Sequence, residues 1–380
     1  MSRKRLLLIS SGDPTNIQTF SGIASHVYQA LTTHYDVDSQ FIHKIPRWVR
    51  LYGSLMNVLF KSRHRLRNSI AYSWAVSKLM EKQVKRTNHQ YNYILFLNCV
   101  QLLAYFDHSL YPNSKIIYYS DSTFQLGIDY YPATTNLIKF NLEEGFKIDK
   151  KAFQKADLIL LSSEWAKSSL TNFYNIRPSI VRILEYGANI KDTQYRERSF
   201  SNEFRLLIVG VDWLRKGIDL AVEVHKQLLE RGYRSQLTII GLKKYPKSLS
   251  SIPNVRLHTF LRKDTPEGEK KIKEEFELAN YFLFPTLADC TPIVLAEAMM
   301  FGLPIVARNT GGLSSMVENG QNGILIDKHG QADDFINGLM EIHKPDVYEK
   351  FAQNSRRLYE TKFNWNHWLL AFQKHLKSMN

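Results

Sequence analysis

Two carboxylates stand on either side of a turn whose residue types suit the binding of an anion. Asp289 and Glu297 are separated by seven residues in the stretch ADCTPIVLAEA. Thr291 is expected to be the N-cap of a helix and Pro292 its first residue, because both residue types are favoured at those positions. The unpaired N–H groups and the dipole of that helix would favour a phosphate at the turn.

A purely structural interpretation of the two carboxylates is also open. Aspartate is common as a capping residue, so Asp289 could serve only to start the helix. Glu297 could be a solvated carboxylate on the exposed side of the same helix. The residue types alone do not separate these two interpretations.

A short strand and a short helix must position this turn. The apolar run from Tyr281 to Phe284 has the length of a buried strand, and Gly302 and Pro304 close the helical pattern that follows. In parallel α/β sheets such a strand-to-helix turn lies outside the carboxyl end of the strand, where these folds bind ligands. The sequence therefore predicts a ligand-binding turn at this point.

The stretch from Phe284 to Ala307 resembles the signature of glycosyltransferase family four, the retaining GT-B enzymes. That signature has two Glu residues with seven between them, and AEAMMFGLPIVA matches its continuation. Asp289 replaces the first Glu, and Cys290-Thr291-Pro292 replaces the usual Gly-Phe-Gly. The resemblance implies that Asp289 contacts the donor sugar, that Glu297 contacts the ribose, and that the backbone of Thr291, Pro292 and Ile293 contacts sugar and phosphate.

A second motif, GVDWLRKG from Gly210 to Gly217, resembles the donor-diphosphate loop of the same family. Arg215 and Lys216 occupy the matching positions, between a strand expected at 205–209 and a helix expected at 218–231. A transferase without a metal needs such cations, because the leaving diphosphate gains negative charge as the glycosidic bond breaks. Two basic residues before a helix are also commonplace, so a structural role is the alternative.

The chain begins like a Rossmann-like domain, with a strand at 5–11, a turn at Ser21-Gly22 and an amphipathic helix. In the family a Gly-rich turn here faces the donor diphosphate and the acceptor, and Gly22 matches it. A plain tight turn is equally compatible with these residues.

Residues YSDSTF, which end a strand expected at 115–119, resemble a bacterial subgroup of the family, as do SSEWA and EYGAN further along. Many relatives have a His beside the donor sugar at this point, and the nearest polar candidate here is Asp121. The alternative is a buried aspartate that holds the loop backbone through local hydrogen bonds.

Length and composition limit the classes to which the protein can belong. The chain has 380 residues, of which 44% are hydrophobic and 23% charged, and this indicates two folded domains. The only cysteines, Cys99 and Cys290, favour a reducing cytoplasm over a disulfide framework. No CxxC or HExxH pair occurs, so neither a metal nor a cofactor is expected. No run of apolar residues approaches the length needed to cross a bilayer.

The motifs occur in the family's order along nearly the whole chain. They predict an α/β protein of the GT-B type, with two Rossmann-like domains facing a central cleft. We expect the acceptor domain at 1–190, the nucleotide-sugar domain at 191–362 after a linker at 191–204, and a C-terminal helix at 363–380 that returns to the first domain. The predicted reaction is metal-independent, retaining hexosyl transfer from a nucleotide sugar to a glycan, lipid-linked or cell-envelope acceptor, with UDP-sugar favoured over GDP-sugar as donor.

Two rival functions share this predicted fold. An inverting GT-B transferase or an epimerase would normally bring a catalytic His or carboxylate from the first domain. A non-catalytic GT-B partner subunit would keep the fold without turnover, and Asp289 in place of Glu hints at this. Analysis of the product anomer and of turnover distinguishes these possibilities.

The net charge of +14 is unevenly distributed. Eight Lys and Arg residues and no acids occur between Ser39 and Met80, where they flank an apolar segment. This composition is typical of a helix that lies on an anionic membrane, so we expect the segment 44–67 to contact the inner face of the cytoplasmic membrane. A solvated basic face is the alternative, and the sequence has no nucleic-acid recognition motif.

Overall fold

The computed structural model describes residues 3–61, 63–192 and 194–379. It divides into two compact units, which we call unit 1 (Met1–Glu185 with Leu369–Asn380) and unit 2 (Tyr186–Trp368). The sequence placed this division between residues 190 and 191, five residues later. Among the described residues, no helix is long and apolar enough to cross a membrane.

Unit 1 is built on a parallel sheet of six strands in the order β2-β1-β3-β4-β5-β6. The central strands are apolar on both faces, as expected for a parallel sheet covered by helices. The strands expected at 5–11 and 115–119 match the first and fourth strands to within one residue, and the short edge strand β6 was not predicted. The strands are β1 (Arg5–Ser10), β2 (Asp36–Phe41), β3 (Tyr93–Leu97), β4 (Lys115–Ser120), β5 (Leu158–Leu161) and β6 (Val181–Ile183).

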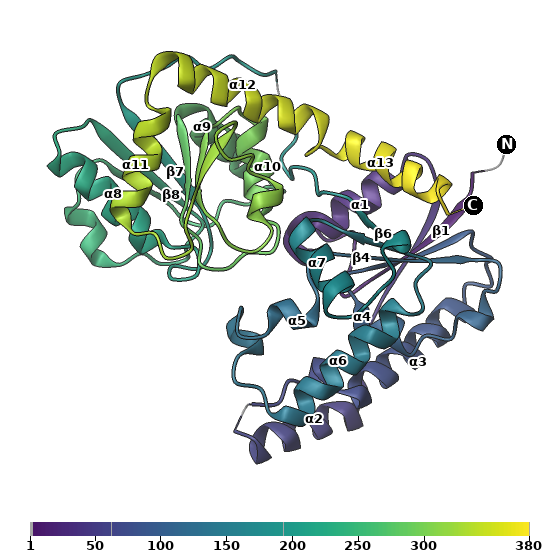
Figure 1. Ribbon diagram of the computed structural model, residues 1–380. Coiled ribbons are helices and arrows are strands. Elements are labelled where there is room, and N and C mark those ends of the chain that lie inside the picture. Colours follow the sequence, from purple (N-terminus) through teal and green to yellow (C-terminus); the bar gives the residue numbers. More distant parts are fainter. Residues whose placement is uncertain (1–2, 62, 193, 380) are drawn as a thin grey trace. The chain divides into compact units, whose positions relative to one another are not determined.

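The helices of unit 1 cover both faces of its sheet. Apolar residues of α3, α4, α6 and α7 form one core with the face that carries Leu7 and Ile9, and α1 lies on the opposite side (Figure 1). The α-helices are α1 (Ile23–Thr32), α2 (Arg47–Leu59), α3 (Ile70–Lys85), α4 (Val100–Ala104), α5 (Phe124–Gly127), α6 (Lys139–Phe153) and α7 (Glu164–Asn172). Short 3-10 turns are η1 (Thr19–Gly22), η2 (Leu66–Asn68), η3 (His108–Leu110), η4 (Pro132–Thr134) and η5 (Pro178–Ile180).

Unit 2 repeats the plan with a parallel sheet in the order β12-β11-β10-β7-β8-β9. Helices α8 and α11 pack on one face, and α9 and α10 on the other. The strands are β7 (Phe204–Val209), β8 (Ser235–Ile240), β9 (Val255–His258), β10 (Tyr281–Phe284), β11 (Ile305–Arg308) and β12 (Gly323–Ile326). The helices are α8 (Ile218–Glu230), η6 (Lys247–Ser251), α9 (Pro266–Leu278), α10 (Ile293–Met300), η7 (Leu313–Ser315), α11 (Ala332–Ile342) and α12 (Pro345–Thr361).

Each sheet has one point at which the strand order reverses. In unit 1 the chain adds β2 on one side of β1 and β3 on the other, and in unit 2 it adds β8 on one side of β7 and β10 on the other. The loops that leave the carboxyl ends of β1 and β3, or of β7 and β10, therefore diverge to opposite faces of the sheet. Such switch points leave a crevice in which parallel α/β folds bind ligands.

The segment predicted as a linker, 191–204, packs against unit 2. The partly buried guanidinium of Arg198 donates hydrogen bonds to the backbone carbonyls of Phe276, Ala279 and Phe301. Those carbonyls lie at the ends of α9 and α10, so Arg198 satisfies helix-terminal acceptors that lack partners within the helix. The segment expected to be the interdomain linker therefore belongs to unit 2, and Arg198 caps helix ends there.

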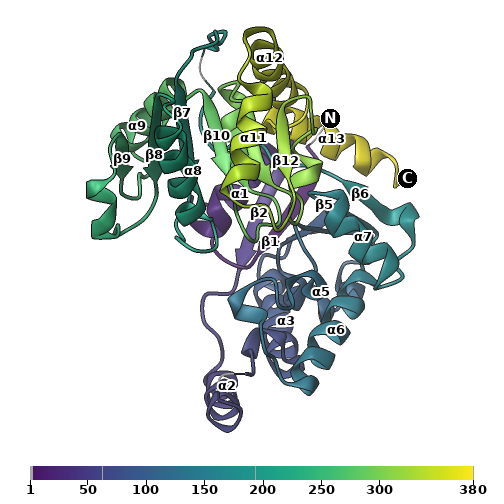
Figure 2. The same cartoon turned by 60° about the vertical axis from the view of Figure 1, so that its left-hand side comes forward.

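The C-terminal helix α13 (Trp365–Lys377) lies within the range expected from the sequence. Its first residues belong to unit 2, where the Trp365 indole donates a hydrogen bond to the carbonyl of Ala188 at 2.9 Å. From Leu369 onward the helix belongs to unit 1, where Phe372 meets the ring of Tyr35 edge to face. Figure 2 shows the helix from a second direction.

Candidate active site

The predicted cations lie in the loop that leaves β7, at the switch point of unit 2. Gly217 caps α8 in the left-handed conformation, with φ of +65°. A Cβ atom at this position would lie 2.2 Å from the carbonyl oxygen of Pro285, so a side chain would force the loops after β7 and β10 apart. The close approach of these two loops therefore depends on a glycine here.

The backbone carbonyl of Arg215 ties the same two loops together. It accepts a hydrogen bond of 2.7 Å from the N–H of Leu287 and another of 3.0 Å from the hydroxyl of Thr286. The guanidinium of Arg215 in turn donates to the carbonyl oxygen of Ala288 at 3.0 Å. These bonds fix the cationic loop against the loop that carries Asp289.

Lys216 and Asp289, which are 73 residues apart in the chain, form a close ion pair. Their side chains are 12% and 14% exposed, and Nη1 of Arg215 lies 3.7 Å from Oδ2 of Asp289. The ammonium of Lys216 also lies 4.9 Å from the ring centroid of Phe284, a cation–π contact. Two cations thus share the carboxylate of Asp289, and Nε of Arg215 also lies 3.8 Å from Oδ2 of Asp212.

The carboxylate of Glu297 is fully buried on α10 and forms an ion pair with Lys263. Its Oε2 atom accepts no hydrogen bond from any residue that the structure describes. The interpretation of Glu297 as a solvated helix carboxylate is therefore wrong. A buried carboxylate oxygen without a donor is unusual, and it marks a position where a hydroxyl group could donate.

Lys263 is a site residue that the sequence analysis missed. It follows β9 and precedes the capped start of α9, where Thr265 accepts a hydrogen bond from the N–H of Gly268. Lys263 also lies between a strand and a helix, but unlike Lys216 it belongs to no motif that resembles the family. No local pattern indicates that Glu297 is its partner, because strand β9 lies at the far edge of the sheet from β10.

The start of α10 differs from the prediction by one residue. The N-cap is Pro292, with φ of −72° and ψ of 108°, and Ile293 is the first helical residue. Thr291 is therefore not the N-cap and Pro292 is not helical, because the extended ψ of the proline delays the first turn. Thr291, Pro292 and Ile293 are all buried beside the turn.

The two remaining predicted residues belong to unit 1. Gly22 caps α1 with φ of +86°, so this turn does require glycine, and the residues before it, Phe20 and Ser21, also have positive φ. Asp121 directly follows β4 and is partly exposed. The structure thus brings Arg215, Lys216, Asp289 and the 291–297 segment together in unit 2, while Gly22 and Asp121 lie at the carboxyl edge of the other sheet.

No group of three or more His, Cys, Asp or Glu side chains that could hold a metal ion occurs in the described part of the chain. The charges at the switch point of unit 2 are those of Arg215, Lys216 and the carboxylates beside them. An array of this kind can bind an anion such as a diphosphate through charge-assisted hydrogen bonds.

Two doubly wound parallel sheets, each with polar groups at its switch point, define an α/β protein with the GT-B fold. Residues 190–358 match the family Glycosyl transferases group 1, and this part of the chain belongs to that family. This match confirms the resemblance to a glycosyltransferase that was noted for the motifs within these residues.

Three similar proteins illustrate the relationship. D-inositol 3-phosphate glycosyltransferase of Gordonia bronchialis is 23% identical over 238 residues, which cover 58% of this chain and 52% of that protein. The chain thus spans about half the length of the curated relatives it matches. Sucrose-phosphate synthase of Thermosynechococcus elongatus superposes with a TM-score of 0.68 at 15% identity, covering 99% of both chains. HepE of Anabaena, in complex with UDP and glucose, superposes with a TM-score of 0.63 at 16% identity, covering 99% of this chain and 100% of HepE.

Proposed function

We propose that the protein transfers a sugar from a nucleotide-sugar donor to an acceptor hydroxyl, with retention of the anomeric configuration. The observation that carries this proposal is the cluster of Arg215, Lys216 and Asp289 at the switch point of unit 2. The cluster lies within the residues that belong to the Glycosyl transferases group 1 family.

The cations would act on the leaving group. In the proposed reaction the acceptor oxygen forms a bond to the anomeric carbon, and the bond from that carbon to the diphosphate oxygen breaks. The proton of the acceptor hydroxyl passes to the released nucleoside diphosphate. Arg215 and Lys216 would stabilise the negative charge that develops on this diphosphate, which removes the need for a metal ion.

The carboxylates would orient the donor. Asp289 would accept hydrogen bonds from the sugar hydroxyls, and the backbone of Thr291 to Ile293 would contact the sugar and the phosphate. The unpartnered oxygen of Glu297 would accept from a ribose hydroxyl. UDP-sugar is the favoured donor because HepE, which has the same fold, is described with UDP and glucose; GDP-sugar is the other candidate.

A panel of nucleotide sugars tests the proposal, with the wild-type protein and the Lys216→Ala variant compared for donor binding and transfer. Transfer by the wild type that the variant loses supports it, and NMR of the product distinguishes retention from inversion. Binding without turnover on every acceptor offered would favour a non-catalytic partner subunit.

We also propose that helix α2 holds the enzyme at an anionic membrane surface, the inner face of the cytoplasmic membrane, near a lipid-linked or cell-envelope acceptor. One side of α2 packs into unit 1, where Val49 and Gly53 are buried. Five other apolar side chains are largely exposed and lie on one arc of the helix. This α2 stripe consists of Trp48 (49% exposed), Leu51 (71%), Leu55 (57%), Val58 (78%) and Leu59 (61%).

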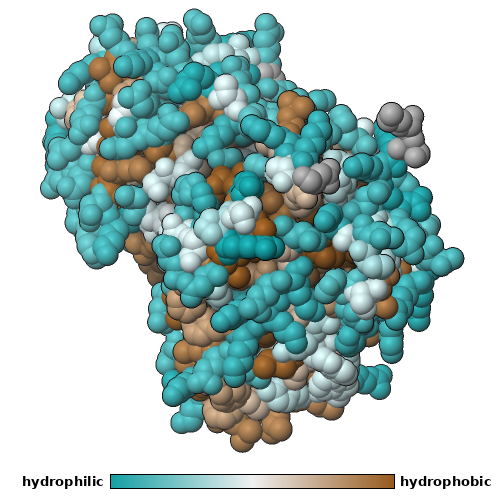
Figure 3. Space-filling view, turned by 45° about the vertical axis from the view of Figure 1, so that its right-hand side comes forward, coloured by the Kyte–Doolittle hydropathy of each residue, from teal (hydrophilic) through white to brown (hydrophobic). Residues whose placement is uncertain are grey.

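The nearby positive charge and the gathering of apolar side chains both favour a lipid surface as the partner of the α2 stripe. The exposed Arg47 and Arg50 lie on the adjoining arc, and no acid occurs between Ser39 and Met80. Brown side chains gather at the lower end of the space-filling view in Figure 3, where Figures 1 and 2 place α2. Apolar side chains beside cations are the arrangement that inserts at the boundary between headgroups and acyl chains.

Vesicle cosedimentation tests this part of the proposal. Arg63 and Arg65 are unsuitable for substitution, because their side chains hold the 132–136 loop through its carbonyl oxygens. The variant Arg47→Ser with Arg50→Ser, and separately Leu51→Ser with Leu55→Ser, should reduce binding to anionic vesicles and leave nucleotide binding unchanged. Equal binding to neutral and anionic vesicles, or insensitivity to both variants, would contradict the proposal.

A further inference from the structure

Unit 1 has a pocket of about 280 Å³ at the carboxyl edge of its sheet. Residues that follow three strands contribute to it: Ser11 follows β1, Asn98 follows β3, and Ser122 lies just beyond β4. The strand order reverses between β1 and β3, so the pocket occupies the switch point of unit 1. Its volume is at the small end of the range for ligand sites and suits a single sugar ring or a group of similar size.

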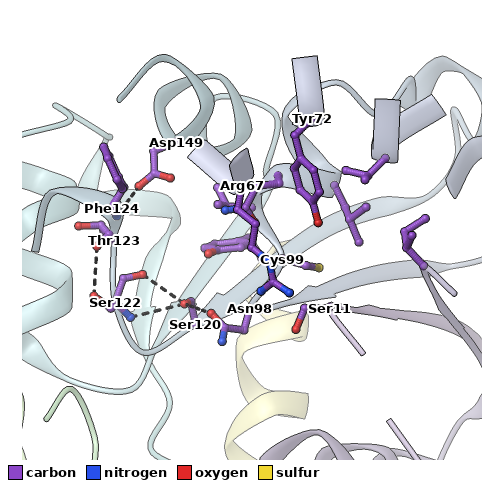
Figure 4. A pocket seen from close by; sticks show the side chains of 16 residues that line it. Ser11, Arg67, Tyr72, Asn98, Cys99, Ser120, Ser122, Thr123, Phe124 and Asp149 are labelled. Atoms are coloured by element: carbon purple, nitrogen blue, oxygen red, sulfur yellow. Dashed lines mark hydrogen bonds between the residues drawn. The ribbon is translucent and has the colours of Figure 1, made fainter. Parts of the chain in front are cut away.

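Neutral polar groups form the floor of this pocket. The hydroxyl of Ser120 donates to Oδ1 of Asn98 at 3.1 Å and lies 3.2 Å from the carbonyl oxygen of Ser122 (Figure 4). Asn98 has a positive φ of 49°, a conformation that costs energy and is concentrated at functional sites. The pocket therefore offers amide and hydroxyl groups of the kind that recognise sugar hydroxyls.

Arg67 supplies the cation among the pocket-lining residues. Its guanidinium points toward the side chains of Asn98 and Ser11 in Figure 4. Within the described residues it forms no hydrogen bond or ion pair, whereas the nearby Arg63 and Arg65 both hold the 132–136 loop. Burial raises the pKa of Tyr72, and the charge of Arg67 opposes this shift, as expected if the guanidinium lies close to that hydroxyl.

The acidic residue that lines the pocket is already occupied by protein donors. Oδ2 of the buried Asp149 accepts hydrogen bonds from the N–H of Phe124 at 2.7 Å and from the hydroxyl of Tyr174 at 2.9 Å. It forms no ion pair with Arg67. The positive charge of Arg67 is therefore left for a group that enters the pocket.

We propose that this pocket binds the acceptor as a sugar or similar polyhydroxylated ring that carries an anionic substituent, with Arg67 as the residue that selects the charge. This inference rests on the proposed function, because it gives the chemistry of the acceptor for that transfer. The shared chemistry is a planar or tetrahedral oxyanion, a carboxylate or a phosphate, which guanidinium binds through two parallel hydrogen bonds. Asn98 and the serines would bind the ring hydroxyls.

Ligand-observed NMR titration of the full chain with glucose, glucuronate and glucose 6-phosphate tests the proposal. At least one of the two acidic sugars should bind about tenfold more tightly than glucose, the scale of one charge-assisted contact. Arg67→Gln should remove that preference, and Arg67→Lys should restore part of it. Arg50→Gln, which removes the same charge from α2, should leave it unchanged.

The two acidic sugars distinguish the carboxylate from the phosphate, since whichever one shows the preference identifies the substituent. The titrations are repeated in the Lys216→Ala variant, because the cations of unit 2 could also bind a phosphate. Equal affinity for glucose and both acidic sugars, a preference that Arg67→Gln leaves intact, or a preference that Lys216→Ala removes would each overturn the proposal. Thermal melting of Arg67→Gln shows that any loss is not due to unfolding.

A parallel titration with UDP separates this inference from the proposed function. Binding of UDP without any preference for acidic sugars would overturn the pocket assignment alone. A preference for acidic sugars that depends on Arg67, without binding of any nucleotide, would leave the pocket assignment in place and overturn the nucleotide-sugar donor.

Discussion

At the switch point of unit 2, the partly buried Asp289 and the buried Glu297 are each held by a lysine, whereas the buried Asp149 in unit 1 is held by neutral donors. Asp289 pairs with Lys216, and Glu297 pairs with Lys263. Asp149 accepts hydrogen bonds from a backbone N–H and a tyrosine hydroxyl, and burial raises its pKa to about 7. The two sheets have equivalent topology, yet they place buried charge in different surroundings.

This difference has a physical consequence for what each switch point can bind. A lysine beside a carboxylate offsets part of the loss of hydration that burial imposes on both charges. The result is a fixed array of charges, which suits a diphosphate. A buried carboxylate that is held by neutral donors takes up a proton more readily. Its site then carries less fixed charge, and such a neutral polar site suits a sugar.

The largest expected effect concerns the cations of unit 2. Lys216→Ala and Arg215→Ala should each lower transfer activity by about 2 to 4 kcal/mol of transition-state stabilisation, the scale for losing a charged donor to a developing anion. The measurement is kcat/KM for the donor, with the acceptor at a saturating concentration. Arg231→Ala, which removes an exposed arginine from unit 2, is the control and should leave activity unchanged. Wild-type turnover in either variant would show that the diphosphate lies elsewhere.

The next effect concerns the stability of the second ion pair. Lys263→Met should leave the buried carboxylate of Glu297 unpaired and lower the free energy of unfolding by about 2 to 3 kcal/mol. Lys226→Met breaks an exposed pair with Glu223 and should cost about 0.5 kcal/mol or less. Urea denaturation measures both values. Equal stability of the two variants would mean that burial of Glu297 gives its pair with Lys263 no extra importance.

Removing the buried charge of Glu297 should identify the cause of the stability lost in Lys263→Met. If the unpaired charge is responsible, the double variant Lys263→Met with Glu297→Gln should recover part of the lost stability, because an amide costs less to bury than a carboxylate. Glu297→Gln alone should also weaken nucleotide binding, since an amide oxygen is a poorer acceptor for ribose hydroxyls. Isothermal titration with UDP measures this second effect.

A smaller effect, dependent on pH, is expected in unit 1. The pKa of Asp149 is about 7 in the folded protein, above the ordinary value of 3.8. Between these values the folded state holds a proton that the unfolded chain has lost, so stability falls as the pH rises through this window. From pH 5.5 to 8 the wild type should lose about 2 kcal/mol relative to Asp149→Asn.

Denaturation of the wild type and of Asp149→Asn at both pH values checks this prediction. Taking the difference between the two proteins removes the contribution of other titrating groups. The wild type and the Asp289→Asn variant, measured in the same way, provide the comparison from unit 2. If the difference in the free energy of unfolding between the wild type and Asp149→Asn does not change with pH, Asp149 is ionised throughout this pH range.

The smallest effect is expected from removal of metal ions. If protein cations alone oppose the diphosphate charge, activity should persist in excess EDTA, with a change in kcat of less than about twofold. Re-addition of Mg²⁺ or Mn²⁺ should have equally little effect. Strict dependence on a divalent ion would contradict the role proposed for Arg215 and Lys216.

Local sequence patterns determined much of this protein. Apolar runs bounded by polar turns predicted the strands at 5–11, 115–119, 205–209 and 281–284 to within one residue, because buried parallel strands must be apolar on both faces. Glycines at the starts of α1 and α8, Gly22 and Gly217, have the left-handed conformation that short turns demand. The spacing of Asp289 and Glu297 also indicated the site, since it reflects one turn and one short helix.

Tertiary structure alone decided which charges meet and which apolar residues remain exposed. Lys216 meets Asp289 because β7 and β10 are neighbours in the sheet, although 73 residues separate the two side chains in the chain. Lys263 reaches Glu297 from a loop after the edge strand β9, and no local pattern specifies that contact. The sequence showed that α2 is rich in apolar residues, but only packing selects which of them face unit 1 and which form the exposed stripe. Local propensity depends on near neighbours in the chain, whereas ion pairs and burial depend on the order in which the strands assemble.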